Sequence, residues 1–162
     1  LMTQYPELSI ELGLVHRTTA SLLAILQDQE DPLSLLFTDD HYSATHLYHD
    51  SKILAAVNRG LAKAFATLIA AIPPSRPIRI LEIGAGTGGT TQSLLPLCPR
   101  ERTRYCYTDL SAVFFDKAKE RFAEYSFVSY QVLDIEKSPK RQGFIPHQFD
   151  IVIAANVLHA TE

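Results

Sequence analysis

A cluster of glycines directly after an apolar segment is the feature that most restricts the fold of this chain. Residues 81–89 read Leu-Glu-Ile-Gly-Ala-Gly-Thr-Gly-Gly, and the segment from Arg79 to Ile83 is typical of a buried strand. Glycine tolerates positive φ and has no Cβ, so such a loop turns tightly and lets a ligand approach the backbone. A helix is expected next, from about Thr90 to Leu97. The segment therefore predicts a strand, a ligand-binding loop and a helix in succession.

The same alternation continues through the second half of the sequence. Further strands are expected at Arg104–Thr108, Phe127–Val132 and Phe149–Ala155, and a helix capped by Ser111 is expected over 111–125. The last run is almost entirely apolar, as in a strand that is buried on both faces. Strands that alternate with helices predict an α/β fold with a doubly wound, mostly parallel sheet.

The first part of the sequence has helical periodicity instead. Apolar residues recur at helical spacing between Leu8 and Leu26, and a long amphipathic helix is expected from an N-cap at Asp50 to the Pro73-Pro74 pair. Its predicted apolar face consists of Ile53, Val57, Leu61, Phe65, Leu68 and Ile72. We therefore expect a helical region over residues 1–50 and a sheet-containing core over 51–162.

Composition excludes several classes of protein and partner. The 162 residues are 46% hydrophobic and 20% charged, which is ordinary for a globular domain. A net charge of −3 argues against a nucleic-acid partner. The most apolar stretch, 61–72, carries Lys63 and is shorter than the roughly 20 residues of a spanning helix, so no membrane partner is expected.

Neither the cysteines nor the histidines indicate a metal site. Cys98 and Cys106 have no zinc-ligand spacing and are expected to be free thiols in a reducing, cytoplasmic compartment. His41, His46 and His49 with Asp50 lack a further ligand at zinc-like spacing. We expect no bound metal.

The glycines alone do not identify the cofactor. Gly84, Gly86 and Gly89 also satisfy the dinucleotide pattern G-x-G-x-x-G. Glu82, however, lies two residues before Gly84, where dinucleotide folds usually have an apolar residue. A carboxylate there can bind an ammonium group, which NAD lacks and S-adenosylmethionine has. The alternative interpretation of Glu82 is a surface acid without a ligand.

Two further acids follow the next two predicted strands. Asp109 lies 20 positions after Gly89, where an acid can accept hydrogen bonds from both ribose hydroxyls. Alternatively it caps the helix that begins near Ser111. Asp134 follows the third strand and is predicted to meet an adenine amino group. Ligands of such sheets bind at the carboxyl ends of the strands, which is where these acids fall.

On these residues the sequence resembles the class I S-adenosylmethionine-dependent methyltransferases, and more narrowly the methyltransferase domain embedded in type I modular polyketide synthases. The resemblance is carried by residues 80–91, 107–111, 133–136, 142–144 (Gln-Gly-Phe) and 149–161, which end in Asn-Val-Leu-His-Ala-Thr. It implies a Rossmann-like fold with residues 1–50 as a helical lid or linker. It also implies that 51–162 are the N-terminal part of the cofactor-binding core and that the later strands are missing.

The resemblance implies methyl transfer from S-adenosylmethionine to the α-carbon of a β-ketoacyl chain held by an acyl carrier protein, with other synthase domains flanking this one. The cofactor-binding residues it implies are Glu82, Gly84, Ala85, Gly86, Gly88, Asp109, Leu110, Asp134, Ile135 and Asn156. The catalytic residues it implies are His159, Tyr48 and Asn156. His159 is the base, since a carbon between a ketone and a thioester is weakly acidic and a neutral imidazole can take its proton.

Each of these roles has an alternative. His159 can be a strand-end histidine bonded to backbone, Asn156 a turn residue, and Tyr48 a core aromatic. O-methylation, a non-catalytic structural domain and a nicotinamide-dependent reductase are the alternative functions. The family's glutamate partner for His159 would lie beyond Glu162, so we expect this stretch alone to bind cofactor poorly. We also expect it to expose an apolar sheet edge at Phe149–Ala155.

Overall fold

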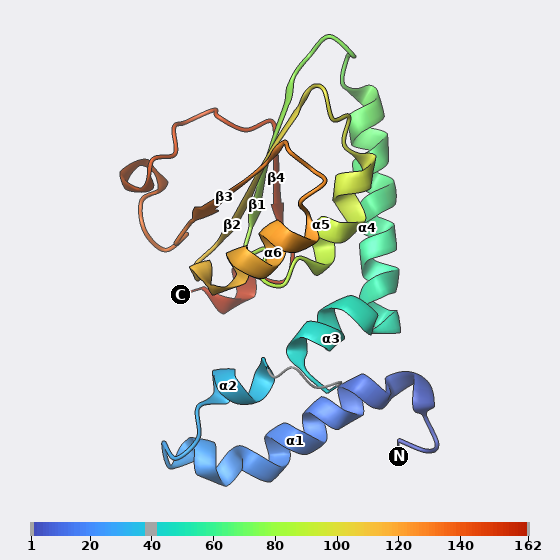
Figure 1. Cartoon of the computed structure of the whole chain (residues 1–162), viewed down its shortest axis with the longest axis vertical. Helices are drawn as coiled ribbons and strands as arrows, with labels where there is room; N and C mark the ends of the chain where they lie inside the picture. Colours follow the sequence, from blue (N-terminus) through green and yellow to red (C-terminus); the bar gives the residue numbers. More distant parts are fainter. Residues whose placement is uncertain (1, 38–41, 162) are drawn as a thin grey trace. The chain divides into compact units, whose positions relative to one another are not determined.

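The computed structural model describes residues 2–37 and 42–161 of the chain (Figure 1). It divides into two compact units, Leu1–Gly60 and Leu61–Glu162. The boundary lies inside helix α4 (Lys52–Ala71), ten residues after the boundary predicted from the sequence. The first unit is helical and the second contains the sheet, and the assignment of these parts as a lid or linker and a cofactor-binding core stays a prediction.

Helices make up the first unit. They are a short 3-10 turn η1 (Pro6–Leu8), α1 (Ser9–Leu26), α2 (Pro32–Leu36), α3 (Ala44–Asp50) and the first part of α4. Gly13 of α1 lies against the ring of Tyr42, where a Cβ would come within 2.2 Å of Cδ1. The side chain of Ser43 caps α3 by accepting a hydrogen bond from the His46 N–H at 3.3 Å.

The predicted cap of the long helix is wrong by one residue. Asp50 ends α3, where its carboxylate lies 2.6 Å from Nδ1 of His46. Ser51 occupies the gap between the two helices, and its hydroxyl accepts a hydrogen bond from the Leu54 N–H. Ser51 also donates to Glu11 of α1 at 2.6 Å, so the serine is tied to a second helix as well.

Four parallel strands form the sheet of the second unit. They are β1 (Ile78–Ile83), β2 (Thr103–Asp109), β3 (Val128–Val132) and β4 (Ile151–Ala154). Their order is β3-β2-β1-β4, so the chain moves outward from β1 to β3 and then returns to the other side of β1. This reversal is the doubly wound arrangement, and it confirms the predicted α/β class. It places a topological switch between β1 and β4, where ligands of such sheets bind.

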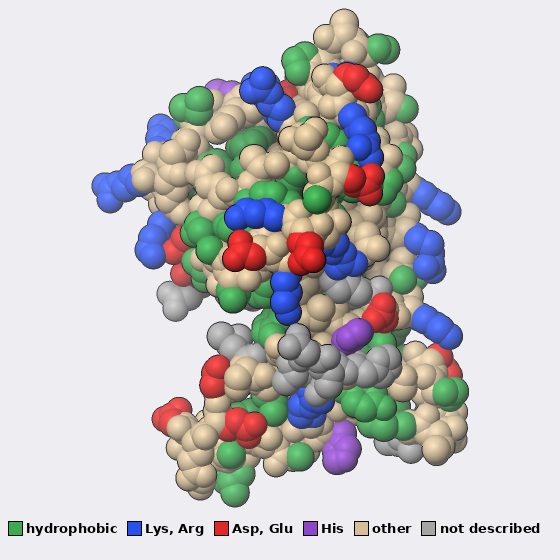
Figure 2. Space-filling view, in the orientation of Figure 1, with side chains coloured by type: hydrophobic (Ala, Val, Ile, Leu, Met, Phe, Trp, Pro, Cys, Tyr) green, Lys and Arg blue, Asp and Glu red, His purple; other side chains and the backbone are tan. Residues whose placement is uncertain are grey.

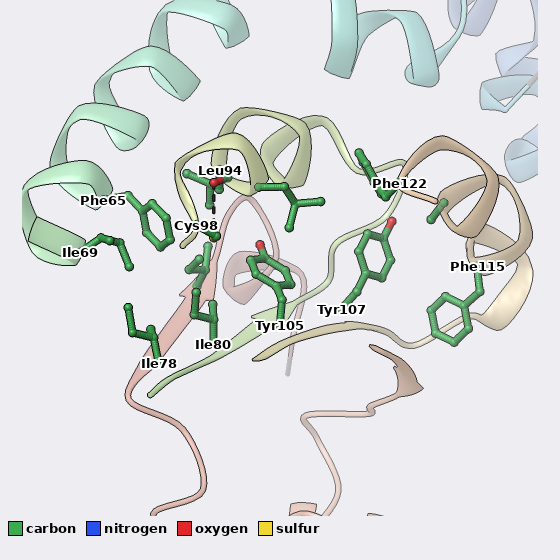
Figure 3. Close-up of a cluster of buried hydrophobic side chains, with 13 residues drawn as sticks. Phe65, Ile69, Ile78, Ile80, Leu94, Cys98, Tyr105, Tyr107, Phe115 and Phe122 are labelled. Carbon is green, nitrogen blue, oxygen red and sulfur yellow. Dashed lines mark hydrogen bonds between the residues drawn. The ribbon is translucent and has the colours of Figure 1, made fainter. Parts of the chain in front are cut away.

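Helices cover one face of the sheet. The end of α4, α5 (Gly89–Leu94) and α6 (Phe115–Arg121) pack on side chains such as Ile80, Tyr105 and Tyr107 (Figure 3). The 3-10 turns η2 (Leu95–Leu97) and η3 (Ala112–Phe114) extend α5 and precede α6. Ser111 caps η3 as predicted, by accepting from the Val113 N–H. The helix that follows ends at Arg121, earlier than expected.

The predicted apolar face of α4 is only partly right. Phe65 and Ile69 are buried in the core between the helices and the sheet, and Leu61 and Ile72 pack against this core. Ile53, Val57 and Leu68 are exposed instead. Most of the apolar stretch 61–72 belongs to this 20-residue helix, which, unlike the stretch alone, is long and apolar enough to cross a membrane by length and composition. That is weak evidence for a span, since a core helix passes the same test.

The other face of the sheet is covered by the segment that joins β3 to β4. Leu81 and Cys106 contact Leu133 and Phe144, and the turn η4 (Pro139–Gln142) lies in this segment. Cys106, like Cys98, is a buried free thiol. Val152 of β4 is 58% exposed on this face, so the prediction that β4 is buried on both faces is wrong. In the order of the described strands β4 lies at one edge and β3 at the other.

The surface carries charges of both signs. In Figure 2 the Lys and Arg side chains and the Asp and Glu side chains are interspersed on the face in view. This distribution agrees with the small net charge of −3.

Candidate functional site

The glycine loop after β1 requires glycine for two different reasons. Gly84, Gly86 and Gly88 have φ angles of +62°, +56° and +80°, which is the left-handed region that favours glycine. At Gly84 a Cβ would lie 2.4 Å from Cγ2 of Val157, and at Gly88 it would lie 2.8 Å from the Phe122 ring. At Gly86 the only atom near an added Cβ is the Gly84 oxygen, at 4.0 Å. The loop is thus packed at both ends and open at its centre.

Hydrogen bonds fix the centre of this loop. The Gly86 N–H donates to Oδ2 of Asp109 at 2.9 Å, and the Tyr107 hydroxyl donates to the Gly86 carbonyl. The Ala85 N–H donates to the Thr108 carbonyl at 2.9 Å. All three partners belong to β2, so the register of β1 against β2 determines the shape of the loop.

Glu82 lies behind the loop, inside the molecule. Its side chain is 1% exposed, and its Oε2 accepts hydrogen bonds from the hydroxyls of Thr91 at 2.6 Å and Tyr105 at 2.8 Å. Burial raises the pKa of Glu82 to about 7, although the two hydroxyl donors act in the opposite direction. The carboxyl therefore joins α5 to β2. Its predicted contact with a ligand ammonium stays a prediction.

Asp109 ends β2 directly beside the glycine loop. Oδ2 accepts from Gly86, and Oδ1 accepts from the Ser111 N–H at 3.0 Å. Ser111, not Asp109, is the cap residue of the following turn. Each carboxylate oxygen has a second lone pair, so Asp109 can still accept from the hydroxyls of a ligand. The predicted ribose contact stays a prediction.

Asp134 follows β3 at the same edge. Its Oδ2 lies 2.7 Å from Nζ of Lys137, and its Oδ1 accepts from the Glu136 N–H at 3.0 Å. The hydrogen bond from Lys137 lowers the pKa of Asp134 below its ordinary value. The Leu133 N–H donates to the Asp109 carbonyl at 3.0 Å, which brings the ends of β2 and β3 together. Sequence reasoning missed Lys137, although its i,i+3 spacing from Asp134 is a signal that could have found it.

Two of the other predicted cofactor-binding residues flank these acids. Leu110, next to Asp109, is exposed, and so is Val113 on the turn that follows. Ile135, next to Asp134, is partly buried against the cluster that contains Leu133 and Phe144. An exposed apolar surface thus adjoins Asp109 at the carboxyl edge.

The segment after β4 contributes the remaining residues of the second unit. Val157 contacts the position of Gly84, so this segment lies against the glycine loop. Asn156 has a φ of +56° and is exposed, as expected of a turn residue. His159 is exposed on the turn η5 (Leu158–Ala160). The structure therefore brings Asn156 and His159 to the edge that holds the loop and Asp109.

Tyr48 belongs to the other unit. It is half-buried in α3, and its predicted place in the active site stays a prediction. Within residues 2–37 and 42–161, no group of three His, Cys, Asp or Glu side chains is arranged to hold a metal ion. His41 lies outside the described residues.

Comparisons with known proteins agree on one family. Residues 81–162 match the family described as "Methyltransferase domain". The non-reducing polyketide synthase ausA of Penicillium brasilianum is 37% identical over 99% of this chain, and the hybrid PKS-NRPS synthetase iliA of Neonectria sp. is 38% identical over 94%. The chain spans only 7% and 4% of the lengths of these two relatives.

Solved structures show the same likeness. The CurJ carbon methyltransferase is 46% identical with a TM-score of 0.93, and the citrinin polyketide synthase CMeT domain is 32% identical with a TM-score of 0.86. Both matches cover 99% of this chain and 43% of the other. The trans-methyltransferase CalH, solved in complex with SAH, is 33% identical with a TM-score of 0.76. This match covers 96% of this chain and 42% of the CalH chain. The chain belongs to the methyltransferase domain family, and its relatives are polyketide synthases and their carbon methyltransferase domains.

Proposed function

We propose that this chain transfers a methyl group from S-adenosylmethionine to the α-carbon of a β-ketoacyl chain carried by an acyl carrier protein. The observation that carries the proposal is the junction of the glycine loop with Asp109, where the Gly86 N–H meets the carboxylate. One solved relative is named a carbon methyltransferase, another is the CMeT domain of a polyketide synthase, and a third is in complex with SAH.

The residues of the carboxyl edge fit an adenosyl cofactor. The loop is open at Gly86, so a ligand can approach the backbone there. Asp109 ends β2 and Asp134 follows the neighbouring strand β3 by two residues, and both carboxylates have lone pairs for ribose hydroxyls and an adenine amino group. The exposed Leu110 offers an apolar surface beside them.

In this proposal His159 acts as the base. The exposed imidazole on η5 takes the proton from the substrate carbon between the ketone and the thioester, and the resulting carbanion is stabilised as an enolate. When bound, S-adenosylmethionine supplies an electrophilic methyl group for that carbon. Asn156, two residues after β4, orients the substrate or a water molecule, and the family resemblance adds Tyr48 as a further catalytic residue.

The setting of the reaction is part of the same proposal. The relatives are large polyketide synthases and hybrid synthetases, which supports flanking synthase domains and a carrier protein as partners. A carrier protein in the same polypeptide is held at high effective concentration, so the small net charge of this chain is no obstacle to their meeting. The two buried free thiols support a cytoplasmic location.

The test incubates the full-length protein with a β-ketoacyl carrier protein and isotopically labelled S-adenosylmethionine, and then locates the new methyl group. Methylation at the α-carbon supports the proposal, whereas methylation at oxygen would establish the runner-up function. Cofactor binding without any transfer would indicate a structural domain. A His159→Asn variant should lose C-methylation, while His147→Asn, an exposed histidine of the β3–β4 segment, should keep it.

A further inference from the structure

Gln142 makes an unusual set of hydrogen bonds to the segment that carries Asp134. Its Oε1 accepts from the Asp134 N–H at 2.8 Å, and its Nε2 donates to the Asp134 carbonyl at 2.8 Å. One side-chain amide thus satisfies both backbone polar groups of one residue. This is the pairing that a neighbouring strand would supply, and it begins two residues after β3 ends.

Gln142 itself is held firmly by its own neighbours. Gly143 has a φ of +89° and ends η4, and Phe144 is buried beside Leu133, the residue before Asp134. The Gln131 side chain of β3 donates to the Gln142 carbonyl at 2.8 Å. The Gln-Gly-Phe segment therefore anchors one glutamine amide on both sides.

The Asp134 carboxyl is left out of this pairing. Gln142 binds only the backbone of Asp134, while the carboxylate lies against Lys137 and the Glu136 N–H. Gln142 therefore determines where the carboxylate is placed without using its lone pairs. Loss of the amide would let the backbone of Asp134 shift, because its N–H would lose its acceptor and its carbonyl would keep only the weaker hydrogen bond from the Lys137 N–H at 3.2 Å.

We propose that Gln142 is a positioning residue that fixes the Asp134 carboxylate for recognition of the adenine amino group. This inference rests on the proposed function, because it takes the ligand to be an adenosyl cofactor. It assigns a role to a segment that the proposed methyl-transfer chemistry does not use.

The test measures binding of two ligands to the full-length protein by calorimetry. S-adenosylhomocysteine carries the amino group, and S-inosylhomocysteine carries a carbonyl oxygen in its place. Wild type should prefer the adenosyl ligand, and Gln142→Ala should bind it about tenfold more weakly, with a much smaller change for the inosyl ligand. The kcat at saturating S-adenosylmethionine should stay unchanged while its KM rises.

Gln148→Ala is the matched control. Gln148 is a glutamine of the same segment, and its side chain accepts from the Ile145 N–H at 3.1 Å. This variant should keep the wild-type preference. If Gln142→Ala also keeps it, or weakens both ligands equally, the proposed positioning role is overturned.

A second variant separates positioning from general destabilisation. In Gln142→Glu a carboxylate oxygen would face the Asp134 carbonyl and repel it, whereas a protonated carboxyl can donate to it. Adenosyl affinity relative to wild type should therefore recover as the pH falls toward 5. An affinity ratio that does not change with pH would contradict the proposal.

Amide hydrogen exchange tests the pairing without any ligand. The Asp134 amide should exchange faster in Gln142→Ala than in wild type, because its acceptor is gone. Unchanged exchange would overturn the inference even if the protein binds cofactor normally. If the wild-type protein binds neither ligand but the Asp134 amide still exchanges faster in the variant, the proposed function is overturned. Gln142 would then serve only to hold the backbone of Asp134 in place.

Discussion

The two edges of the sheet use carboxylates in opposite ways. At the amino edge, Asp150 lies just before β4, and its oxygens bind Arg76 at 2.7 Å and Arg79 at 3.0 Å, in addition to the Arg79 N–H. At the carboxyl edge, Asp109 binds backbone N–H groups of the glycine loop and of Ser111. The first carboxylate lies between two guanidinium groups, whereas each oxygen of the second accepts from a backbone N–H.

This difference separates stability from binding. The guanidinium groups of Arg76 and Arg79 tie β4 to β1 and hold the pKa of Asp150 well below its ordinary range. A carboxylate that binds only N–H groups stays available to further donors, such as hydroxyls. We therefore expect changes at the amino edge to alter unfolding and changes at the carboxyl edge to alter cofactor affinity.

The largest effect is expected for Asp109→Asn. In the proposed site two ribose hydroxyls donate to the charged carboxylate, whereas the amide keeps only one, uncharged, acceptor oxygen. The loss is about 3 kcal/mol, so the affinity for S-adenosylhomocysteine should fall about a hundredfold. Calorimetric titration measures this directly. An unchanged dissociation constant would show that Asp109 serves the loop alone. Asp150→Asn is the control, and it should bind the ligand like wild type.

The contribution of Glu82 to the free energy of unfolding should fall as the pH rises. Burial raises its pKa in the folded state from 4.5 to about 7, so the folded protein binds the proton more tightly than the unfolded chain does. The contribution of Glu82 to stability is then fully present below about pH 4.5 and is lost as the pH rises to about 7, by up to about 3 kcal/mol. Glu82→Gln should remove this dependence in denaturant unfolding between pH 5 and 8. A slope that persists in the variant would assign the effect to another group.

Asp150→Asn should lower stability by about 2 kcal/mol, because two guanidinium groups and one backbone N–H lose their charged acceptor. Its pH dependence has the opposite sign to that of Glu82. The depressed pKa of Asp150 stabilises the fold above about pH 4, and this contribution is lost as the pH falls further. Unfolding midpoints of wild type and variant should therefore converge in acid. Midpoints that stay apart in acid would mean that packing, not charge, holds β4.

The sequence predicts the carboxyl edge better than the amino edge, for a physical reason. Glycines, strand ends and acids such as Asp109 occur within a few residues of one another, so local patterns place them. The partners of Asp150 lie more than 70 residues away along the chain, and only the register of β1 with β4 brings them together. Glu82 lies between these cases: a buried acid implies a partner, but the strand pattern cannot show that Thr91 and Tyr105 provide it.

The errors on apolar residues have a similar cause. Periodicity places Ile53 and Val57 on the same face of α4 as Phe65, yet only the later part of the helix packs on the sheet cluster. Val152 is apolar, but the β3–β4 segment covers Leu81 and Cys106 and leaves Val152 exposed. Amphipathic patterns show which residues share a face. They do not show how much of that face another element covers.

The smallest expected effect comes from Tyr107→Phe, which tests how tightly the loop must be held for binding. Burial raises the pKa of Tyr107, so its hydroxyl stays protonated and donates to the Gly86 carbonyl. The phenylalanine ring keeps the packing against Phe115 and Phe122 and removes only this hydrogen bond, which is worth about 1 kcal/mol. Cofactor affinity should fall severalfold.

Tyr130→Phe is the matched control for this last change. Tyr130 packs on Tyr107 with ring centroids 5.3 Å apart, but its hydroxyl donates to the Ala118 carbonyl of α6 at 3.2 Å instead of to the loop. Both variants should lose similar stability in denaturant unfolding, while only Tyr107→Phe should lose affinity in calorimetry. Equal affinity losses would mean that the ring cluster as a whole sets the loop. In that case the core residues behind the carboxyl edge would affect both stability and cofactor affinity, and the separation of the two properties would hold only at the edges themselves.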